Sequence, residues 1–258
     1  MILDLVPADD RGLMLGDGLF ETLLAEDGRL QDFDPHLARM TRGCAVLGIE
    51  PPDAALARIA AQAALKAARA LTGRAAVRLT LTAGSGRGLD RPVPARGRLL
   101  ASASAAPASE GPVSLATADV RRNQTSPASK LKTLSYLDNV LARRQARASG
   151  AEEALMLNGR GEIACAAAAN VFWVREGRLY TPALDCGVLD GIMRGRAIEA
   201  ARKLGAEAIE TAAAPEALIE AEGAFLTNSL IGVRPVDRLD GRPLPQSPLT
   251  EALSSRCS

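Results

Sequence analysis

The segment Ala168–Pro182, AANVFWVREGRLYTP, carries the pattern that decides the fold class of this chain. Its first part, Asn170–Arg175, is mostly apolar and aromatic, and the short run Arg178–Tyr180 follows it. Only Glu176 and Gly177 separate the two runs. Two such runs joined by a two-residue turn that contains glycine predict an antiparallel β-hairpin.

The same antiparallel pattern extends outward from this hairpin in both directions. Further strands are predicted at Leu19–Ala25, Arg29–Phe33, Val77–Thr82, Glu153–Leu157, Glu162–Ala166, Ala224–Thr227 and Val233–Val236. Helical apolar spacing predicts helices at Pro35–Leu47, Asp53–Leu71, Tyr136–Ala148 and Arg194–Leu204. Because the short strands do not alternate regularly with helices, we expect an α+β fold with antiparallel meanders.

A change in composition marks the expected division of the chain into domains. Residues 101–112, ASASAAPASEGP, are small and nearly uncharged and include two prolines, which is typical of a connection between domains. We therefore predict a small N-terminal domain over residues 1–105, a linker over residues 106–112 and a larger C-terminal domain over residues 113–258.

The charge balance excludes several classes of function. The 258 residues include 31 basic and 30 acidic ones, so the net charge is +1. A general nucleic-acid-binding protein should carry a basic surplus, and no nucleic-acid partner is expected here. His36 is the one histidine of the chain, which removes most metal sites and allows a Ser-His-Asp mechanism only with His36 as its base. Proton chemistry is therefore expected from lysine, a carboxylate, tyrosine or cysteine.

The cysteines and the apolar stretches indicate a compartment. Four cysteines are scattered over the sequence without a CxxC pair, which is typical of a reduced intracellular protein. The N-terminal Met1–Asp4 lacks the basic start of a signal peptide, and Ile163–Val174, the longest nearly apolar stretch, is too short to span a bilayer. We expect a soluble cytoplasmic protein without a membrane partner.

Three glycine-containing turns and one lysine are candidate binding groups. Gly84–Gly88, GSGRG, offers backbone N–H groups and Arg87 to a carboxylate or phosphate, although most such motifs are ordinary loops. Gly191–Met193 precedes a predicted helix and Asn228–Gly232 follows a strand, so both can hold an anion on backbone N–H groups. The segment Lys130-Leu131-Lys132 stands just before a predicted helix, and a lysine there is either solvated or a desolvated nucleophile. Together these features suggest a phosphorylated cofactor.

Four segments together resemble the fold-type IV, or class-IV aminotransferase, family of pyridoxal phosphate enzymes. They are DRGLMLGDGLFET (Asp10–Thr22), HLAR (His36–Arg39), KTLSYLDNVLARRQA (Lys132–Ala146) and AANVFWVREGRLYTP (Ala168–Pro182). The resemblance covers nearly the whole chain. It implies pyridoxal 5'-phosphate as the cofactor, a small N-terminal α/β sandwich domain, a larger domain with a mixed, barrel-like sheet and flanking helices, and a homodimer.

Within this family, three segments resemble the aminodeoxychorismate lyases more than the transaminases. They are the GSGRG loop, CAAAANVFW (Cys165–Trp173) and LDGIMR (Leu189–Arg194). The implied reaction converts 4-amino-4-deoxychorismate to 4-aminobenzoate and pyruvate, a step towards folate. The alternatives are a transaminase acting on branched-chain or D-amino acids, and a cofactor-binding homologue with little activity.

The resemblance also implies a cofactor site with named residues. Lys132 would form the Schiff base with the cofactor and carry protons during the reaction. Arg39 would bind the cofactor phosphate, together with Ser229 and the backbone amides of Ile192 and Met193.

Further roles are implied for residues that would contact the substrate. Arg87 would hold a substrate carboxylate, and Asn228 would also contact the substrate. Thr22, in the FET turn, is the suggested proton donor to the leaving group. His36 would be a structural residue.

Cys165 occupies a position at which the resembled family usually has a glutamate. That glutamate lies five residues before the asparagine of the NxF motif, here Asn170, and its carboxylate pairs with the pyridine nitrogen of the cofactor. Glu162 is the nearest acid, but strand alternation would place it on the opposite face. Cys165 would then face the cofactor with a weakly bonding thiol. This loss should harm transamination more than an elimination that is driven by aromatisation of the product.

Overall fold

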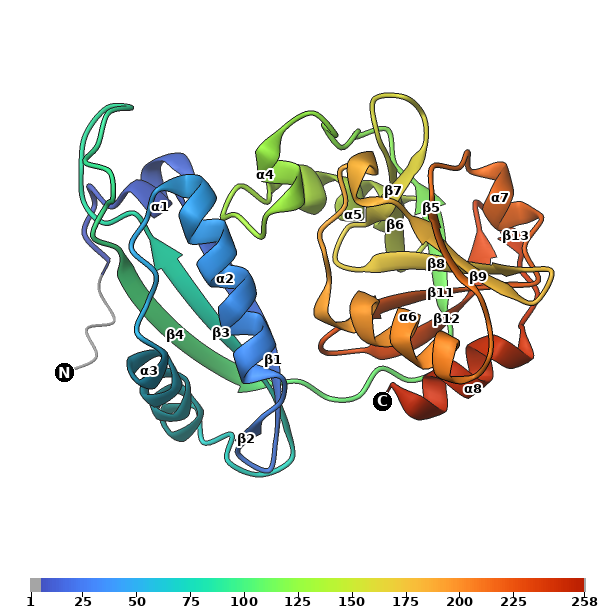
Figure 1. Cartoon of the computed structure of the whole chain (residues 1–258), viewed down its shortest axis with the longest axis horizontal. Coiled ribbons are helices and arrows are strands. Elements are labelled where there is room, and N and C mark those ends of the chain that lie inside the picture. The colour runs from blue at the N-terminus through green and yellow to red at the C-terminus, as the bar shows by residue number, and fades with distance from the viewer. Residues whose placement is uncertain (1–5, 258) are drawn as a thin grey trace. The chain divides into compact units, whose positions relative to one another are not determined.

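A computed structural model describes residues 6–257 and divides the chain into two units (Figure 1). The first unit runs to Ala108 and also includes the later segment Leu131–Ser135. The second unit consists of Ser109–Lys130 and the residues from Tyr136 onward. The division predicted at residues 106–112 does not include this return, which brings Lys132 into the first unit.

The first unit is a four-stranded antiparallel sheet with three helices. Its strands are β1 (Gly18–Glu26), β2 (Arg29–Leu30), β3 (Arg74–Thr82) and β4 (Arg98–Ala105), in the order β2-β1-β3-β4. Its helices are α1 (Arg11–Leu15), α2 (Phe33–Leu47) and α3 (Ala54–Ala67). The turn between β1 and β2 has Asp27 and Gly28 at φ 46° and 74°, as a two-residue hairpin of the primed type requires.

Side-chain alternation sorts the residues of β1 onto two faces of the sheet, one of which packs against α2 and α3. Leu19 and Leu23 of β1 are buried in the core that includes residues of α2 and α3. Phe20 and Thr22 alternate with them and therefore lie on the opposite face. In β1, odd-numbered residues such as Leu19 and Leu23 therefore face the core, and even-numbered residues such as Phe20 and Thr22 face the other way.

β4 corrects part of the sequence interpretation. The whole stretch 101–112 has the composition of a connection between domains, but residues 101–105, the end of the predicted small domain, form part of β4. Ala101 and Ala103 pack against the core of the first unit, while Ser102 and Ser104 alternate with them. The low complexity of this stretch therefore reflects strand alternation with small residues and not a linker.

Leu131–Ser135 join the sheet at an edge of β1. The N–H of Phe20 donates to the carbonyl oxygen of Lys132 at 2.9 Å, and the N–H of Leu134 donates to that of Gly18 at 3.0 Å. This edge is open to them because β2 pairs only with the other end of β1, at residues 25 and 26. The backbone of Lys132 is therefore fixed by β1.

The second unit is built on a nine-stranded mixed sheet. Its strands are β5 (Val113–Thr117), β6 (Glu153–Leu157), β7 (Ile163–Ala166), β8 (Asn170–Arg175), β9 (Arg178–Pro182), β10 (Ala208–Thr211), β11 (Gly223–Asn228), β12 (Gly232–Leu239) and β13 (Arg242–Pro243). The order is β10-β9-β8-β11-β12-β5-β6-β7, with β13 beside β12. Its helical elements are α4 (Pro127–Lys130), α5 (Leu137–Ala148), η1 (Leu184–Cys186), α6 (Ile192–Lys203), α7 (Glu216–Ile219) and α8 (Pro248–Arg256).

The predicted hairpin is the β8–β9 pair, and β8 also pairs with β11. Phe172 of β8 and Phe225 of β11 are cross-strand partners whose rings stack with 4.8 Å between centroids. They share a core with Met193 at the start of α6. Asn170 and Thr227 form the next pair on the same face of the sheet, so this face also carries polar side chains.

The elements of both units confirm the predicted α+β class. The sequence interpretation missed β10 and α8, which lack a strong apolar period. Within residues 6–257, no helix combines the length and the apolar character needed to cross a membrane. The four cysteines, Cys44, Cys165, Cys186 and Cys257, are buried free thiols.

Candidate active site

Lys132 lies in the first unit beside the start of β1. Its Nζ is 4.3 Å from the centre of the Phe20 ring, and the guanidinium of Arg78 stacks on the same ring at 3.7 Å. Burial, and then the charge of Arg39, lower the pKa of Lys132 to about 8, with Glu21 opposing and Arg78 adding to the shift. Such a lysine is partly a free amine near neutral pH and can act as a nucleophile or a base.

Glu21 joins two side chains of α2 through a buried carboxylate. It is 1% exposed, and its Oε2 lies 2.7 Å from His36 Nδ1. Arg39 donates to both oxygens, from Nε to Oε1 at 2.8 Å and from Nη2 to Oε2 at 2.6 Å. Burial alone would raise the pKa of Glu21, but the hydrogen bonds from Arg39 and His36 outweigh it and hold that pKa below its ordinary value.

Thr22 lies within β1, on the face of the sheet opposite to the core that includes α2 and α3. This position corrects its predicted place in a turn. Its cross-strand neighbour is Arg78, whose Nε donates to Thr80 Oγ1 at 3.3 Å. Thr22, Arg78 and Thr80 therefore form a polar group on the same face as the Phe20 ring. A role for Thr22 as proton donor stays a prediction.

Arg87 is exposed in the GSGRG loop, and Arg11 holds the end of that loop. Arg11 is buried and donates to the carbonyl oxygen of Gly88 at 2.8 Å and to that of Leu89, just after the loop, at 3.1 Å. Arg11 and Arg91 both donate to Asp17 Oδ2 at 2.9 Å. The loop is thus anchored on its backbone and presents Arg87 at the surface. Its contact with a substrate carboxylate stays a prediction.

In the second unit, the N-terminus of α6 has the properties of an anion site. The helix begins at Ile192, and the preceding Gly191 provides no side-chain cap. The first backbone N–H groups, including those of Ile192 and Met193, therefore have no partner within the helix. Glycine is required before them because a Cβ at Gly191 would lie 2.1 Å from Oδ1 of Asn170.

Thr227 adds a buried hydroxyl group on the sheet face that contacts α6. Its Oγ1 has no hydrogen-bond partner, although the residue is only 1% exposed. Thr227 is the cross-strand partner of Asn170, which itself approaches Gly191. An unsatisfied buried hydroxyl costs about 1–3 kcal/mol. A phosphate, with several acceptor oxygens, therefore suits the donors present at this helix start.

Asn228 builds the turn that carries Ser229. Its Oδ1 accepts hydrogen bonds from the N–H groups of Leu230 and Ile231 at 2.9 and 3.0 Å. Its Nδ2 donates to the carbonyl oxygen of Ala168 at 2.9 Å. The backbone thus engages both ends of the Asn228 amide. A substrate contact for Asn228 and a phosphate contact for Ser229 stay predictions.

Cys165 lies in β7 and packs in a cluster of small residues that includes side chains of α5. Burial raises the pKa of its thiol, against the positive charge of Arg122 and with the negative charge of Glu153. Glu153 is itself buried, and burial raises its pKa despite a backbone hydrogen bond from Ala154 and the charge of Arg143 at 2.8 Å. A neutral thiol is only a weak hydrogen-bonding group.

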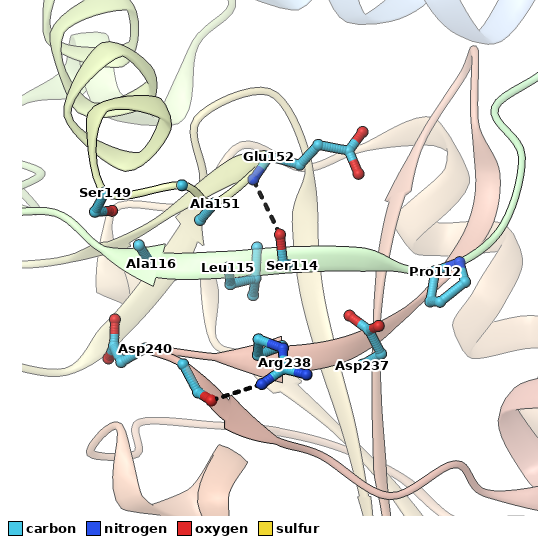
Figure 2. A pocket seen from close by; sticks show the side chains of 12 residues that line it. Pro112, Ser114, Leu115, Ala116, Ser149, Ala151, Glu152, Asp237, Arg238 and Asp240 are labelled. Atoms are coloured by element: carbon cyan, nitrogen blue, oxygen red, sulfur yellow. Dashed lines mark hydrogen bonds between the residues drawn. The ribbon is translucent and has the colours of Figure 1, made fainter.

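A surface hollow of about 730 Å³ lies elsewhere in the second unit (Figure 2). In it, Arg238 donates to the carbonyl oxygen of Gly241 at 2.8 Å, and the N–H of Glu152 donates to Ser114 Oγ at 3.1 Å. None of the predicted site residues lines this hollow. Among residues 6–257, no cluster of three or more His, Cys, Asp or Glu side chains is placed to hold a metal ion.

Comparison with known proteins places this geometry in a family. The model of the class IV amino-transferases matches residues 18–239. An aminodeoxychorismate lyase of Bacillus subtilis is 33% identical over 242 residues, covering 90% of this chain and 80% of that protein. A bifunctional aminodeoxychorismate lyase / D-amino acid transaminase of Mycobacterium tuberculosis is 29% identical over 277 residues, covering 98% of this chain and 92% of that protein.

A solved structure supports the same relationship. A hypothetical aminotransferase from Mycobacterium tuberculosis in its PLP-bound form has a TM-score of 0.87 and 27% identity, and the match covers 98% of this chain and 92% of that one. The chain belongs to the class IV amino-transferase family. The predicted fold-type IV architecture is thereby confirmed. Because the relatives include a lyase and a bifunctional enzyme, membership defines the enzyme class and leaves the reaction open.

Sequence reasoning does not single out Glu21, Arg78 or Thr227. Glu21 has a detectable signal, because it is an acid at an inward position of an alternating strand. Arg78 stands likewise at an outward position of the alternating VRLTLT run. Thr227 offers no such signal, because the absence of a partner for its hydroxyl depends on packing that only the fold defines.

Proposed function

We propose that this protein is a pyridoxal-phosphate-dependent lyase that converts 4-amino-4-deoxychorismate to 4-aminobenzoate and pyruvate. The observation that carries the choice of a lyase over a transaminase is the buried, neutral thiol of Cys165 at the position where the family's carboxylate is expected. The lyase relative from Bacillus subtilis supports the same choice.

The family and the PLP-bound neighbour indicate pyridoxal phosphate as the cofactor. When bound, it supplies an aldehyde that captures amines and a conjugated ring that withdraws electrons. Lys132 would hold it covalently, and Arg39 would bind its phosphate. The helix start at Ile192 and Met193 suits the same phosphate and, with Ser229, completes the proposed set. The unpaired hydroxyl of Thr227 supports this assignment, because it offers one more donor to an anion.

In the proposed reaction, the amine of Lys132 takes the proton from C4 of the substrate ring. The bond between the neighbouring ring carbon and the enolpyruvyl oxygen then breaks, and the ring becomes aromatic. Protonation of the released enolpyruvate gives pyruvate, and Thr22 is the proposed donor. A lysine with a pKa of about 8 suits the first step, because a base acts best when its pKa is near the working pH.

The runner-up is a transaminase of the same family, and the bifunctional relative keeps it in consideration. Transamination depends on a long-lived carbanion that is reprotonated on the cofactor, and it therefore relies on a protonated pyridine ring. A neutral Cys165 thiol cannot fix that proton as a carboxylate would. The elimination draws its driving force from aromatisation, so the thiol harms it less.

The decisive experiment supplies the purified chain with pyridoxal phosphate and 4-amino-4-deoxychorismate, without a keto-acid acceptor. We expect equal amounts of 4-aminobenzoate and pyruvate. Lys132→Ala should lower turnover by roughly 10²–10⁴-fold or more and abolish borohydride-fixed cofactor. Lys130→Ala is the matched control, because Lys130 lies two residues away with its side chain 45% exposed and paired with Asp185.

Other outcomes would reassign the protein. Product formation only in the presence of a keto acid would make it a transaminase. No turnover with either type of substrate, together with normal cofactor binding, would make it a cofactor-binding homologue. We also propose a homodimer, which sedimentation at several protein concentrations would test.

A further inference from the structure

We propose that Glu21 is a positioning residue for the reaction: its carboxylate fixes the guanidinium of Arg39 and sets the pH range in which the Lys132 amine gains and loses its proton. The inference rests on the proposed function only in taking Lys132 as the reacting amine. The influence of Glu21 on Lys132 has a geometric basis in the first unit. The N–H of Phe20, the residue before Glu21 in β1, donates to the carbonyl oxygen of Lys132 at 2.9 Å, and Glu21 holds the guanidinium of Arg39.

The geometry around Glu21 leaves its carboxylate little freedom. Three hydrogen bonds of 2.6–2.8 Å reach it from Arg39 and His36. Arg39 uses two nitrogens of its fork, so the plane of the guanidinium is fixed relative to β1. His36 lies three residues before Arg39 on α2 and is 1% exposed. The single histidine of the chain thereby serves to hold a carboxylate.

The charged groups that act on Lys132 come from three elements of the first unit. Glu21 is supplied by β1, Arg39 by α2 and Arg78 by β3. The two arginines favour the neutral amine and lower its pKa, whereas Glu21 favours the ammonium form and raises it. Glu21 also offsets the charge of Arg39 directly. Removal of Glu21 would therefore lower the pKa of Lys132 in two ways, by the loss of its own negative charge and by leaving the charge of Arg39 unopposed.

This balance matters because Lys132 has two tasks. Bond formation with an aldehyde requires the neutral amine, and proton abstraction requires an amine basic enough to keep the proton. Burial and two arginines alone would make the amine a weak base. Glu21 restores part of its basicity, so that one lysine serves for both tasks.

The test measures the titration of Lys132 without any substrate. The full-length protein, cleared of cofactor, is labelled with acetic anhydride over pH 6 to 10, and acetylation of each lysine is quantified by mass spectrometry. The chain has only four lysines, so Lys66, Lys130 and Lys203 serve as internal references. The pH dependence of the visible band of the cofactor-loaded protein provides a second, spectroscopic readout.

Glu21→Gln should shift the titration of Lys132 to lower pH and increase its labelling at pH 7 by roughly threefold. Glu21→Asp keeps the charge and should restore most of the wild-type profile. Arg78→Leu removes a neighbouring positive charge and should shift the profile in the opposite direction. Glu153→Gln is the matched control, because it removes a buried carboxylate paired with an arginine in the other unit.

An unchanged Lys132 titration in Glu21→Gln, or one no different from that of Glu153→Gln, would overturn the proposal. If Glu21→Gln does not fold, Glu21→Asp and Arg78→Leu still decide it, because a wild-type profile in Arg78→Leu contradicts the charge balance. A failed lyase assay with a normal labelling shift would reject the proposed function and leave the role of Glu21 intact.

Discussion

Two buried glutamates, one in each unit, show how differently the protein treats the same carboxyl group. Glu21 is 1% exposed and Glu153 is 4% exposed. Glu21 accepts hydrogen bonds from Arg39 and His36, and its pKa lies below the ordinary value. Glu153 has the backbone N–H groups of Ala154 and Ala167 and the side chain of Arg143, which is 46% exposed, as partners, and its pKa is raised.

The comparison teaches that partners, and not burial, decide the charge of a buried acid. Burial raises the pKa of both carboxyl groups. Only Glu21 has enough hydrogen-bond donors to outweigh it, because a bidentate arginine and a histidine converge on the same two oxygens. The first unit thus keeps a fixed negative charge beside its lysine, whereas the surroundings of Cys165 disfavour charge.

The largest effect expected from this comparison is a loss of folding stability when the Glu21 carboxylate is removed. At pH 7, Glu21→Gln should lower the free energy of unfolding by about 3–5 kcal/mol, because it leaves Arg39 without its ionic partner. The pKa of Glu21 is lowered in the folded protein, so its contribution is present above the ordinary pKa of 4.5 and is lost as the pH falls through the folded-state pKa. Urea unfolding between pH 3.5 and 7.5 measures this dependence.

Glu153→Gln should show the opposite pH trend in the same measurement. The pKa of Glu153 is raised, so the wild-type group contributes stability below pH 4.5 and loses it as the pH rises through the folded-state pKa. The substitution should therefore become less harmful, or even stabilising, towards pH 7. Parallel pH trends for the two variants would contradict the comparison.

The next effect concerns the unpaired hydroxyl of Thr227 in the second unit. Thr227→Val should stabilise the protein without cofactor by about 1–3 kcal/mol, because the buried hydroxyl is replaced by a methyl group of similar shape. The same variant should bind pyridoxal phosphate more weakly. Thr250→Val is the matched control: its Oγ1 is also buried and unpaired, but it lies in α8. Both variants should be stabilised, and only Thr227→Val should lose cofactor affinity.

A third change places a carboxylate at position 165 of the second unit, in place of the cysteine. Cys165→Glu should raise keto-acid formation from D- or L-amino acids by roughly tenfold, a change of about 1.4 kcal/mol in the barrier. Cys165→Ser controls for loss of the thiol alone. No increase with Cys165→Glu would count against the account in which the missing carboxylate favours the lyase.

The smallest expected effect concerns Arg78. Arg78→Leu should raise the pKa of Lys132 slightly, because Arg78 is the weakest of the neighbouring charges that act on it. Stability should change by less than about 1 kcal/mol, since the side chain is exposed. The acetylation profile of Lys132 in the cofactor-free protein, referenced to Lys66, Lys130 and Lys203, measures this shift. A fall in the pKa of Lys132 would contradict the assigned sign.

Much of the fold is predictable because local signals agree with the final structure. The β8–β9 hairpin combines apolar runs with a tight Glu176-Gly177 turn, and both residues have positive φ. β4 is harder to predict, because its Ala-Ser alternation has the low complexity of a linker. The return of Leu131–Ser135 to the first unit has no local signal, since it depends on an edge of β1 that is distant in sequence.

The residues of the candidate site also divide into those that the sequence predicts and those that only the fold reveals. Lys132 and Arg39 are predicted from motifs, and Lys132 does have the shifted pKa that a reacting amine needs. Glu21 is missed because its hydrogen bonds are to two side chains of α2 that meet it only in the folded unit. Motif resemblance points to the groups proposed to perform chemistry, whereas the groups that contact them are found only from tertiary structure.

The return of Leu131–Ser135, which carries Lys132, to the first unit has a consequence for dissecting the chain. A fragment ending at Ala108 would contain β1 to β4 but would expose the backbone N–H of Phe20 and the carbonyl of Gly18, which Leu131–Ser135 normally pair. Exposed strand edges of this kind promote aggregation. During synthesis, the nascent first unit must wait for residues beyond 130 before its edge is closed. Lys132 therefore emerges together with the segment that completes that unit, and a single proteolytic cut cannot separate the units intact.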